Sequence, residues 1–569
     1  MNKIEIRNLS FTYPGSDTKI LDNIDLDIQQ GDFIAIIGNN GSGKSTFCKC
    51  INGLIPHFIV GDFEGQVLVN GKSTLDLDVG SLAKEVAYVY QDFENQIVRP
   101  TVLDDASYAL LNYGNEDYEK LGRKALMACG LEGREADYIW QLSGGQTHLL
   151  ALAGAIALGP DILILDEPIA QLDPQNADKI YDILERLRKQ YNKTIISIEH
   201  HTEYIAKFCN KVVLLNKGKI SWMLPTSEAL SRVDELKESD IFPPQITQAA
   251  FKLKEKNIGA FDTSQKLPIS LSEGIDYFSE LKLKDYKKEN IQNNNEEIIR
   301  FEDISLAYNS IKGDPKIIFE DLSFSIKRGD KVALIGSNGA GKSTLMKLLV
   351  GLVKTKAGNI FFKNKNINEV DEEQLARYIS LVYQNPEEMF IQDSIYEDIA
   401  FAMKERDVED YQEKTTALID RFRLAEFKDR DGRLLSGGQM RRASVAIGIA
   451  LEPEVLLLDE PTANLDMATR TEIIRVLEDI KKETETVMIA THDMQLVAQW
   501  ADRVIVLHNG KVIADDSKDR IFDNDYVKNT ISIRAPEIFD LAQSINPKAY
   551  IYTVEDFIAS IDEHAGIRI

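Results

Sequence analysis

The sequence has no run of about 18 apolar residues, the length that a membrane-spanning helix requires. Its longest apolar stretches are short and strand-like, such as FIAIIG at residues 33–38 and VLLLD at residues 455–459. The first residues alternate between polar and apolar like a strand, so we also expect no signal peptide. If the protein works at a membrane, we expect it to do so from outside the bilayer, through partners.

Cysteine is scarce as well, with four residues in 569. Their spacing matches no zinc motif, and four cysteines in a chain of this length make no disulfide framework. We therefore expect small buried side chains at these positions and a cytosolic protein. The four residues are Cys48, Cys50, Cys129 and Cys209.

Positive charge is also in deficit, because 66 basic residues stand against 91 acidic ones and the net charge is −25. A protein that wraps nucleic acid needs a basic surface for the phosphates, so this balance argues against that class. An apolar content of 44% and a charged content of 28% are ordinary for a globular protein. The length predicts three or four domains.

The sequence does contain an internal repeat, in which one unit occurs twice. The string GNNGSGKST at residues 38–46 returns as GSNGAGKST at residues 336–344, with an offset of 298. The string LSGGQ at residues 142–146 returns at residues 435–439, with an offset of 293, and loop deletions of a few residues produce such a drift. Because two units of the same topology pack readily as a symmetric pair, we expect a pseudo-dimer within one chain.

Each half also ends in a tail, and a polar join separates the halves. FPPQITQAAFKL at residues 242–253 resembles RAPEIFDLAQSI at residues 534–545, while LKLKDYKKENIQNNNEEI has the composition of a linker. The predicted segments are a first main domain at 1–240, a first small tail domain at 241–283, a linker at 284–297, a second main domain at 298–531 and a second small tail domain at 532–569.

Each glycine-rich string lies between an apolar strand and a helical pattern, which is the context of a phosphate-binding GxxxxGK[ST] loop. The glycines let successive N–H groups point at a phosphate chain, and the helix N-terminus adds its dipole. Lys44 and Lys342 reach the β- and γ-phosphates, and Ser45 and Ser343 offer a hydroxyl to Mg²⁺. The predicted nucleotide-binding loop residues are Gly38, Asn39, Asn40, Gly41, Ser42, Gly43, Lys44, Ser45, Thr46, Gly336, Ser337, Asn338, Gly339, Ala340, Gly341, Lys342, Ser343 and Thr344.

Two further apolar strands, one in each half, end in an Asp-Glu pair. Two adjacent carboxylates at a strand end are costly without a cation, so we expect Asp166 and Asp459 to orient Mg²⁺. Glu167 and Glu460 lie one residue further and point elsewhere, where each can take a proton from an attacking water.

The string LSGGQ, called the signature below, puts a serine and two glycines at the start of a helix and makes a second phosphate cradle. One nucleotide site has no room for two cradles from the same domain. We therefore expect the cradle of each half to close on the ATP of the other half. The cradle residues are Ser143, Gly144, Gly145, Gln146, Ser436, Gly437, Gly438 and Gln439.

Together with VYQ in each half and a histidine after each Asp-Glu pair, these motifs closely resemble the ATPases of ABC transporters. The resemblance covers both halves and most of the chain. It implies an α/β fold with two tandem P-loop ABC ATPase domains, each with a mostly parallel sheet core, an antiparallel β subdomain and a helical subdomain, and each followed by a small tail domain. It also implies two ATP molecules with Mg²⁺, held head to tail between the two domains.

The resemblance assigns further roles in each half: an aromatic residue that stacks on adenine, a glutamine that contacts Mg²⁺ and reports to a membrane partner, a histidine that holds the γ-phosphate, and an acid of the D-loop, the segment after the Asp-Glu pair that crosses between domains. In that order, the matching residues are Tyr13, Gln91, His200 and Asp173, then Tyr308, Gln384, His492 and Asp466. The predicted catalytic residues are Glu167, Glu460, His200 and His492. The predicted magnesium residues are Ser45, Gln91, Asp166, Ser343, Gln384 and Asp459.

Two places depart from the family pattern. The second signature is followed by MRR, close to the basic run of the family, whereas the first is followed by THL. The first D-loop contains IAQLD where the second has the more usual TANLD. No residue of the phosphate loops, Asp-Glu pairs or signatures is lost, so we expect both sites to hydrolyse ATP, at rates that need not be equal.

Three classes of protein carry two such domains in one chain without a membrane span. A ribosome-acting factor needs a long helical arm and basic surfaces, and a DNA-repair ATPase needs zinc modules, so both fit poorly. The third class is an importer ATPase, and here the segments at 91–112 and 384–403 resemble energy-coupling factor ATPases. A short acidic helix beside the glutamine can take up basic helices of a membrane subunit, although a solvated acidic helix gives the same pattern. The tails resemble the small C-terminal domain of that subgroup.

We therefore expect an energy-coupling subunit that hydrolyses ATP for a vitamin or metal-ion importer. The expected partners are a transmembrane scaffold subunit and a substrate-capture membrane subunit, with no nucleic acid, and the expected location is the cytoplasmic face of the cell membrane, as a peripheral protein. The alternatives are a duplicated ATPase of another importer, such as a sugar importer, a ribosome-acting protein, and a regulatory nucleotide sensor without turnover. Because the substrate does not touch this chain, its identity stays open.

Overall fold

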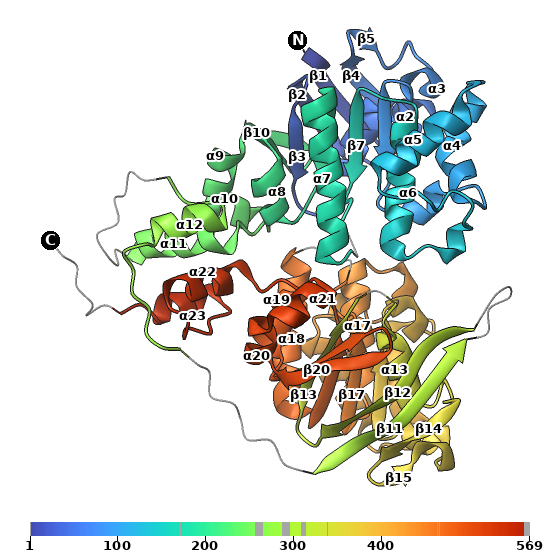
Figure 1. The fold of residues 1–569 in the computed structure, drawn as a ribbon, viewed down its shortest axis with the longest axis vertical. Coiled ribbons are helices and arrows are strands. Elements are labelled where there is room, and N and C mark those ends of the chain that lie inside the picture. Colours follow the sequence, from blue (N-terminus) through green and yellow to red (C-terminus); the bar gives the residue numbers. More distant parts are fainter. Residues whose placement is uncertain are drawn as a thin grey trace. The chain divides into compact units, whose positions relative to one another are not determined.

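A computed structural model describes residues 2–169, 172–256, 266–286, 296–308, 315–337, 339–463, 465 and 467–562. The chain divides into two compact units (Figure 1). The first unit contains Met1–Asp285, Asp540–Ala549 and Val554–Ile569, and the second contains Tyr286–Phe539 and Tyr550–Thr553. In the ranges described, no helix combines the length and the hydrophobicity needed to cross a bilayer.

The first unit is built on two sheets. An antiparallel sheet has the strand order β2-β1-β4-β5, and a six-stranded sheet has the order β10-β9-β3-β8-β7-β6 and is parallel except for the β9–β10 pair. The strands are β1 (Asn2–Thr12), β2 (Leu21–Gln29), β3 (Phe33–Ile37), β4 (Asp62–Val69), β5 (Lys72–Ser73), β6 (Val86–Val89), β7 (Ile162–Asp166), β8 (Thr194–Ile198), β9 (Lys211–Asn216) and β10 (Lys219–Pro225).

The six-stranded sheet is covered on both faces, which explains why β3 is apolar throughout and β7 is apolar up to Asp166. Alternate residues point to opposite sides, so Ile34 and Ile36 pack with the antiparallel sheet while Phe33 and Ala35 pack with the long helices. The helices are α1 (Lys44–Ile51), α2 (Leu54–His57), α3 (Val79–Leu82), α4 (Val102–Asn112), α5 (Tyr118–Ala128), α6 (Gly144–Ala157), α7 (Pro174–Tyr191), α8 (Thr202–Phe208), α9 (Thr226–Ser231), α10 (Val233–Glu238), α11 (Gln245–Lys256) and α12 (Leu271–Tyr277), with 3₁₀ turns η1 (Phe93–Gln96) and η2 (Ile139–Gln141).

The second unit repeats this topology, with sheet orders β12-β11-β14-β15 and β16-β17-β18-β13-β19-β20. Its strands are β11 (Glu297–Tyr308), β12 (Lys316–Lys327), β13 (Lys331–Gly336), β14 (Ala357–Phe362), β15 (Lys365–Asn366), β16 (Ile379–Val382), β17 (Val455–Asp459), β18 (Thr486–Ala490), β19 (Arg503–His508) and β20 (Lys511–Ser517). The predicted α/β fold, with a mostly parallel core and an antiparallel subdomain in each half, is therefore confirmed.

Helices of the second unit follow the same order along the chain. They are α13 (Lys342–Leu349), α14 (Glu372–Leu375), α15 (Ile395–Lys404), α16 (Tyr411–Arg421), α17 (Gly437–Ile449), α18 (Met467–Glu483), α19 (Met494–Trp500), α20 (Lys518–Asp523), α21 (Asp525–Ile531), α22 (Glu537–Ile545) and α23 (Val554–Ala559), with 3₁₀ turns η3 (Ile367–Glu369), η4 (Pro386–Met389), η5 (Ala425–Phe427) and η6 (Gly432–Leu434).

One loop explains why the repeat drifts out of register. Gly53 and Gly351 are 298 residues apart, whereas Gly65 and Gly358 are 293 apart, so the first unit carries five extra residues between these glycines. Gly65 and Gly358 are equivalent, because each has a positive φ and approaches two backbone carbonyls of the first strand of its sheet. The longer loop exposes Phe58, at 72% of its surface.

Helix α23 follows the second unit along the chain but packs within the first unit. The rings of Phe278 and Phe557 meet edge to face at 5.5 Å, and α23 lies beside α11 (Figure 1). Leu283 and Ile561 form an antiparallel bridge, and the amide of Lys284 donates to the carbonyl of Ser560 at 2.8 Å. The two predicted tail segments thus contact each other, whereas most of the predicted linker, residues 287–295, lies outside the described residues.

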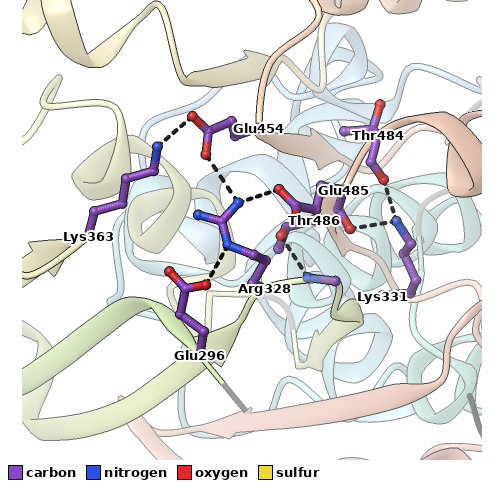
Figure 2. Close-up of polar contacts among 9 residues, drawn as sticks. Glu296, Arg328, Lys331, Lys363, Glu454, Thr484, Glu485 and Thr486 are labelled. Carbon is purple, nitrogen blue, oxygen red and sulfur yellow. Dashed lines mark hydrogen bonds and ion pairs between the residues drawn. The ribbon is translucent and has the colours of Figure 1, made fainter. Parts of the chain in front are cut away.

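A group of charged residues joins strand ends of the second unit (Figure 2). Arg328 donates to Glu296 at 3.0 Å and contacts Glu454 at 3.5 Å as well as Glu485, while Lys363 holds the other oxygen of Glu454 at 2.5 Å. Five separate segments, the β12–β13 turn among them, are therefore tied together.

The equivalent strand ends of the first unit are joined by other charged residues. Asp161, at the position of Glu454, is held by Lys3 at 2.8 Å and by Lys193 at 3.0 Å. Lys193 occupies the position of Glu485, so the sign of the charge is reversed between the halves.

Candidate active site

The first glycine-rich loop connects β3 to α1 and wraps around its own lysine. Gly41 and Gly43 have φ of 77° and 100°, and a Cβ on Gly38 would lie 2.1 Å from the carbonyl oxygen of Leu215. Only glycine fits this path. The Nζ atom of Lys44 donates to the carbonyls of Gly38 at 2.7 Å and Asn39 at 3.0 Å. The ammonium group therefore lies inside the loop, where a phosphate chain would bind.

The second loop has the same construction between β13 and α13. Gly339 and Gly341 have φ of 82° and 101°, and a Cβ on Gly336 would lie 2.3 Å from the carbonyl oxygen of Leu507. Lys342 donates to the carbonyl of Gly336 at 3.0 Å. Asn338, which we predict to bind nucleotide, lies outside the described residues.

The Asp-Glu pairs stand at the carboxyl ends of β7 and β17. Burial raises the pKa of Asp166, which accepts a hydrogen bond from the hydroxyl of Tyr88 at 2.8 Å and which the hydroxyl of Ser45 also contacts. Burial likewise raises the pKa of Asp459 beside Ser343. Within the described part of the chain, Oδ1 of Asp459 is buried without a hydrogen-bond partner. An orphaned carboxylate oxygen next to a serine hydroxyl fits the oxygen ligands that Mg²⁺ prefers.

The next residue of each pair has a left-handed backbone, with φ of 51° at Glu167 and 47° at Glu460. This conformation is strained for a long side chain, and it turns the glutamate away from the aspartate before it. Glu167 then meets His200, whose Nε2 lies 3.1 Å from Oε1, and Glu460 meets His492, whose Nδ1 lies 3.0 Å from Oε2.

These histidines set the charge of the glutamates. Burial alone would raise the pKa of Glu167 and Glu460, but the contact with His200 or His492 lowers it below the ordinary value in both units. The opposite effect appears on His492, because Glu460 outweighs burial and raises the pKa of the imidazole. Each glutamate is thus ionised at neutral pH, the state that a general base needs.

The segment after β6, which contains Gln91, and its equivalent after β16, which contains Gln384, are called Q-loops below. In the first unit, Nε2 of Gln91 donates to Oε2 of Glu167 at 2.9 Å. One carboxylate therefore joins the Q-loop and the histidine. Gln384 in the second unit has an exposed side chain.

Each signature begins a helix, α6 or α17, through a reciprocal cap. Ser143 accepts from the amide of Gln146 at 3.4 Å while the side chain of Gln146 accepts from the amide of Ser143 at 3.0 Å, and the same box forms in the second unit. A Cβ on Gly144 or Gly437 would meet nothing within 4 Å. The two helix starts are therefore open to an approaching anion.

The second glycine of each signature serves packing instead. A Cβ on Gly145 would lie 2.5 Å from the side chain of Asn176, and one on Gly438 would lie 2.4 Å from that of Thr469. Gln146 and Gln439 belong to the caps, so only the first glycine of each signature faces open space.

Tyrosines predicted to stack on adenine have different surroundings. The hydroxyl of Tyr13 lies 3.0 Å from that of Thr46, and its ring meets Phe11 edge to face at 5.0 Å. Tyr308 ends β11 and is 44% exposed. In the first D-loop, Asp173 caps α7 by accepting from the amide of Asn176 at 2.9 Å. Asp466, its predicted counterpart, lies outside the described residues.

The family model described as ABC transporter matches residues 21–170 and 319–463. These two matches together cover more than half of the chain. The chain belongs to the ABC transporter family. It is an ABC ATPase with two nucleotide-binding domains, and it binds and hydrolyses ATP.

Proteins of similar length align over nearly the whole ABC ATPase. One from Caldanaerobacter subterraneus is 30% identical, with 98% of each chain covered, and one from Clostridium perfringens is 31% identical, with 97% of this chain and 98% of that protein covered. Both are described as ABC transporter ATP-binding proteins. CbiO1 of Clostridium perfringens, described as part of the ABC transporter complex CbiONQ, is 27% identical over 42% of this chain and 94% of its own, with a TM-score of 0.37.

Sequence reasoning missed the residue that holds the first histidine of this ABC ATPase in place. Glu199 is 2% exposed and accepts from the amides of His200 and His201, each at 2.9 Å, and from the hydroxyl of Tyr181 at 2.5 Å. The sequence signal for this role is the acid in SIEHH, which stands where the second half has ATHD. A buried acid at the end of a strand needs hydrogen-bond donors around it.

The second unit uses a different network. Asp493 accepts from Nε of Arg470 at 2.7 Å, from the hydroxyl of Thr462 at 2.9 Å and from the amide of Leu496 at 2.9 Å. In the first unit His201 stands at the position of Asp493 and Ala177 at that of Arg470. The two units therefore differ in the whole network of polar contacts beside the histidine and not at one position alone.

Acids that follow the Q-loops also have a structural role. Oδ1 of Asp105 accepts from the amides of Val98 and Arg99 at 2.8 and 3.0 Å, and Oδ1 of Asp398 accepts from those of Ile391 and Gln392 at 2.8 Å each. Both side chains are buried, so neither is free to attract a basic partner helix. Part of the acidic pattern that resembles energy-coupling factor ATPases is thus a loop anchor.

A groove opens beside the first Q-loop. It has a volume of about 300 Å³ and lies between α3, β6, the Q-loop, α4 and α6. Its lining is mainly apolar and aromatic, and it includes Leu54, Val79, Tyr90, Tyr108 and Ala151. Val98 at its edge is 58% exposed.

Proposed function

We propose that this ABC ATPase is the energy-coupling subunit of a membrane importer of the energy-coupling factor type, for a vitamin or a metal ion. ABC ATPases of transporters work with membrane partners, and ATP hydrolysis on this chain would drive such partners. The observation that supports the proposal is the mainly apolar groove beside the Q-loop of Gln91, because a membrane partner that docked there would lie close to a side chain that contacts Glu167.

In the proposed mechanism, each site combines residues of both halves. Lys44 and Lys342 hold the phosphate chain, and the signature serine of the other half, Ser436 or Ser143, closes on the γ-phosphate. Hydrolysis then removes this link and lets the halves separate. Complete loops, Asp-Glu pairs and signatures in both units support two competent sites.

The glutamates supply the general base in this mechanism. Glu167 and Glu460 are ionised, turned away from the neighbouring aspartate and held by a histidine. Each takes a proton from the attacking water as the oxygen of that water bonds to the γ-phosphorus, while the bond from the γ-phosphorus to the bridging oxygen breaks and ADP leaves. His200 and His492 then hold the γ-phosphate. Before nucleotide binds, the contacts of His200 with Glu167 and of His492 with Glu460 keep the two imidazoles at the site.

Mg²⁺ would neutralise charge on the β- and γ-phosphates when it is bound. The residues that would hold it are Ser45, Asp166 and Gln91 in the first half and Ser343, Asp459 and Gln384 in the second. The unpartnered oxygen of Asp459 beside Ser343 fits this role, and so does the pairing of Asp166 with Ser45.

The importer class rests on the segments after the Q-loops and on the tails. Exposed acids remain there after the loop anchors are set aside, among them Asp92 and Glu94 in the first unit and Glu387 and Glu388 in the second. They stand beside the Q-loops, where basic helices of a transmembrane scaffold would contact them. A strongly acidic chain, with a net charge of −25, further disfavours a ribosomal partner.

Purification of the tagged full-length chain from membrane extracts tests the proposal. We expect a transmembrane scaffold protein and a smaller substrate-capture membrane protein to co-purify, and a reconstituted complex to take up substrate only with ATP. A variant with Lys44→Ala and Lys342→Ala is the matched control, because it should keep the partners and lose uptake. Recovery of ribosomes without a membrane protein would overturn the proposal, and recovery of a complex with a soluble binding protein would favour another importer class.

A further inference from the structure

The two signature helices differ at one buried position that faces the Q-loop. His148 in α6 and Arg441 in α17 each lie five residues after the signature serine. Their exposed fractions are 7% and 3%. The departure of THL from MRR noted in the sequence is therefore a change in the interior of each domain.

Arg441 connects α17 to the backbone of the second Q-loop. Its guanidinium donates to the carbonyl of Tyr383 at 2.9 Å and to the carbonyl of Gln384 at 2.6 Å. Two parallel bonds from one planar group to successive carbonyls fix the orientation of the peptide between them. That peptide carries Gln384, so the bonds also determine where its side chain starts.

The charge of this guanidinium bears on the same site. Burial lowers the pKa of Arg441 to about 10, while Asp459 and Glu460 favour the charged form. The group is therefore a cation at neutral pH, close to the Asp-Glu pair of its own domain. It links the signature helix, the Q-loop and the acids electrostatically as well as by hydrogen bonds.

His148 fills the same position without making these bonds. Its ring lies against that of Phe93, with 3.4 Å between the centroids, and its Nδ1 lies 3.2 Å from the carbonyl of Gly144. Burial lowers the pKa of His148 to about 4, so the ring is neutral at pH 7. No hydrogen bond joins His148 to Tyr90 or Gln91 in the described first unit, and Gln91 is held through Glu167 instead.

We propose that Arg441 is a positioning residue that ties the start of α17 to the second Q-loop and sets Gln384, whereas the first half lacks this tie. Movement of one signature helix is then transmitted to its Q-loop by hydrogen bonds, whereas movement of the other is transmitted by packing, in which the ring of His148 lies against that of Phe93. The two ATP sites are consequently unequal in how firmly their Q-loops are held. This goes beyond the proposed importer function, and only the magnesium measurement below rests on the proposed role of Gln384.

Hydrogen–deuterium exchange on the full-length chain tests the tie without nucleotide, metal or partner. In Arg441→Met we expect amide exchange over residues 383–390 to rise about tenfold or more, because two charge-assisted bonds no longer oppose local opening. Exchange over residues 90–97 should not change. Arg441→Lys, which keeps the charge and can reach one carbonyl, should fall between Arg441→Met and the wild type.

Arg442→Met is the matched control. Arg442 is the next residue on α17, but it pairs with Glu472 at 3.0 Å, and among the described residues it makes no hydrogen bond to the Q-loop. We expect this variant to leave exchange over residues 383–390 unchanged. An equal rise in Arg442→Met, or no rise in Arg441→Met and Arg441→Lys, would overturn the proposal.

A second readout separates positioning from general stability. The Mg²⁺ concentration for half-maximal ATP binding should rise several-fold in Arg441→Met, while ADP binding without Mg²⁺ should not change. If both affinities fell together, or neither changed, Arg441 would be a packing residue only.

Discussion

The Nε2 atom of His200 lies 3.1 Å from the carboxylate of Glu167, whereas His492 approaches Glu460 through Nδ1, at 3.0 Å. The two units thus reach the same pairing with opposite nitrogens of the imidazole. The nitrogen that remains for a phosphate is Nδ1 in one half and Nε2 in the other. Equivalent motifs therefore do not present equivalent atoms to the nucleotide.

The glutamates provide the most direct test of two-site hydrolysis. Glu167→Gln and Glu460→Gln each remove a base while keeping the size of the side chain, and loss of a general base costs about 10²–10⁴ in rate. We expect each single variant to lower steady-state phosphate release strongly, and the double variant to abolish it. ATP binding, measured by equilibrium titration, should persist in all three. Unchanged turnover in one single variant together with complete loss in the other would show that only one site works.

His148 should make the protein sensitive to mild acid. Its pKa is about 4 in the folded chain and about 6.5 when unfolded, so the unfolded state binds an extra proton between these values. This residue therefore costs no stability above pH 7 and lowers the free energy of unfolding by about 2 kcal/mol at pH 5. His148→Gln should remove that loss. Urea denaturation of both proteins at pH 7.5 and pH 5 measures it, and an equal acid effect in the variant would contradict the assignment.

Glu199 should act on stability through the amides that it satisfies. Glu199→Leu leaves the N–H groups of His200 and His201 without this acceptor, at about 1 kcal/mol each because both amides are only partly buried. Glu199→Gln keeps an acceptor of the same size and should cost much less. Tyr181→Phe, which removes one bond to Glu199, should cost about 1 kcal/mol. Urea denaturation ranks the three, and equal effects of Leu and Gln at position 199 would argue against the hydrogen-bonded role.

The charges at the equivalent strand ends, Lys193 in the first unit and Glu485 in the second, can be exchanged by substitution. Lys193→Glu places a second acid beside Asp161, as Glu485 stands beside Glu454 in the second unit. The first unit has no equivalent of Arg328, which binds both acids in the second unit. We expect a loss of about 1 kcal/mol or less at low salt, because Asp161 is partly exposed and solvent screens the pair. Adding Gln30→Arg, at the position of Arg328, should recover part of this loss. Thermal unfolding at low and high salt tests it, and high salt should shrink both effects.

Much of this architecture could be predicted from the sequence because its signals are local. Lys44 and Lys342 follow glycines whose positive φ only that residue adopts easily, and the strands before them are apolar throughout or apolar after the first residue. The order of the motifs also predicted which strands end in Asp166 and Asp459. These features need only a few adjacent residues to be recognised.

Features that depend on distant residues could not be predicted in this way. Asp105 reads as one more charge on an acidic helix, and only the folded loop shows that it accepts from Val98 and Arg99. Glu199 reads as a neighbour of two histidines until Tyr181, from another helix, is placed against it. The contact between Phe278 and Phe557 joins segments almost 280 residues apart, and no pattern in either segment specifies the other.

That last contact has a consequence for synthesis on the ribosome. Phe278 is fully buried, and the segment that packs against it, Val554–Ala559, is translated only after the second nucleotide-binding domain. Until the second nucleotide-binding domain has been made, the first unit therefore has an uncovered apolar surface around Phe278. A chain released early would keep this surface open, and cellular quality control could distinguish it from the finished protein.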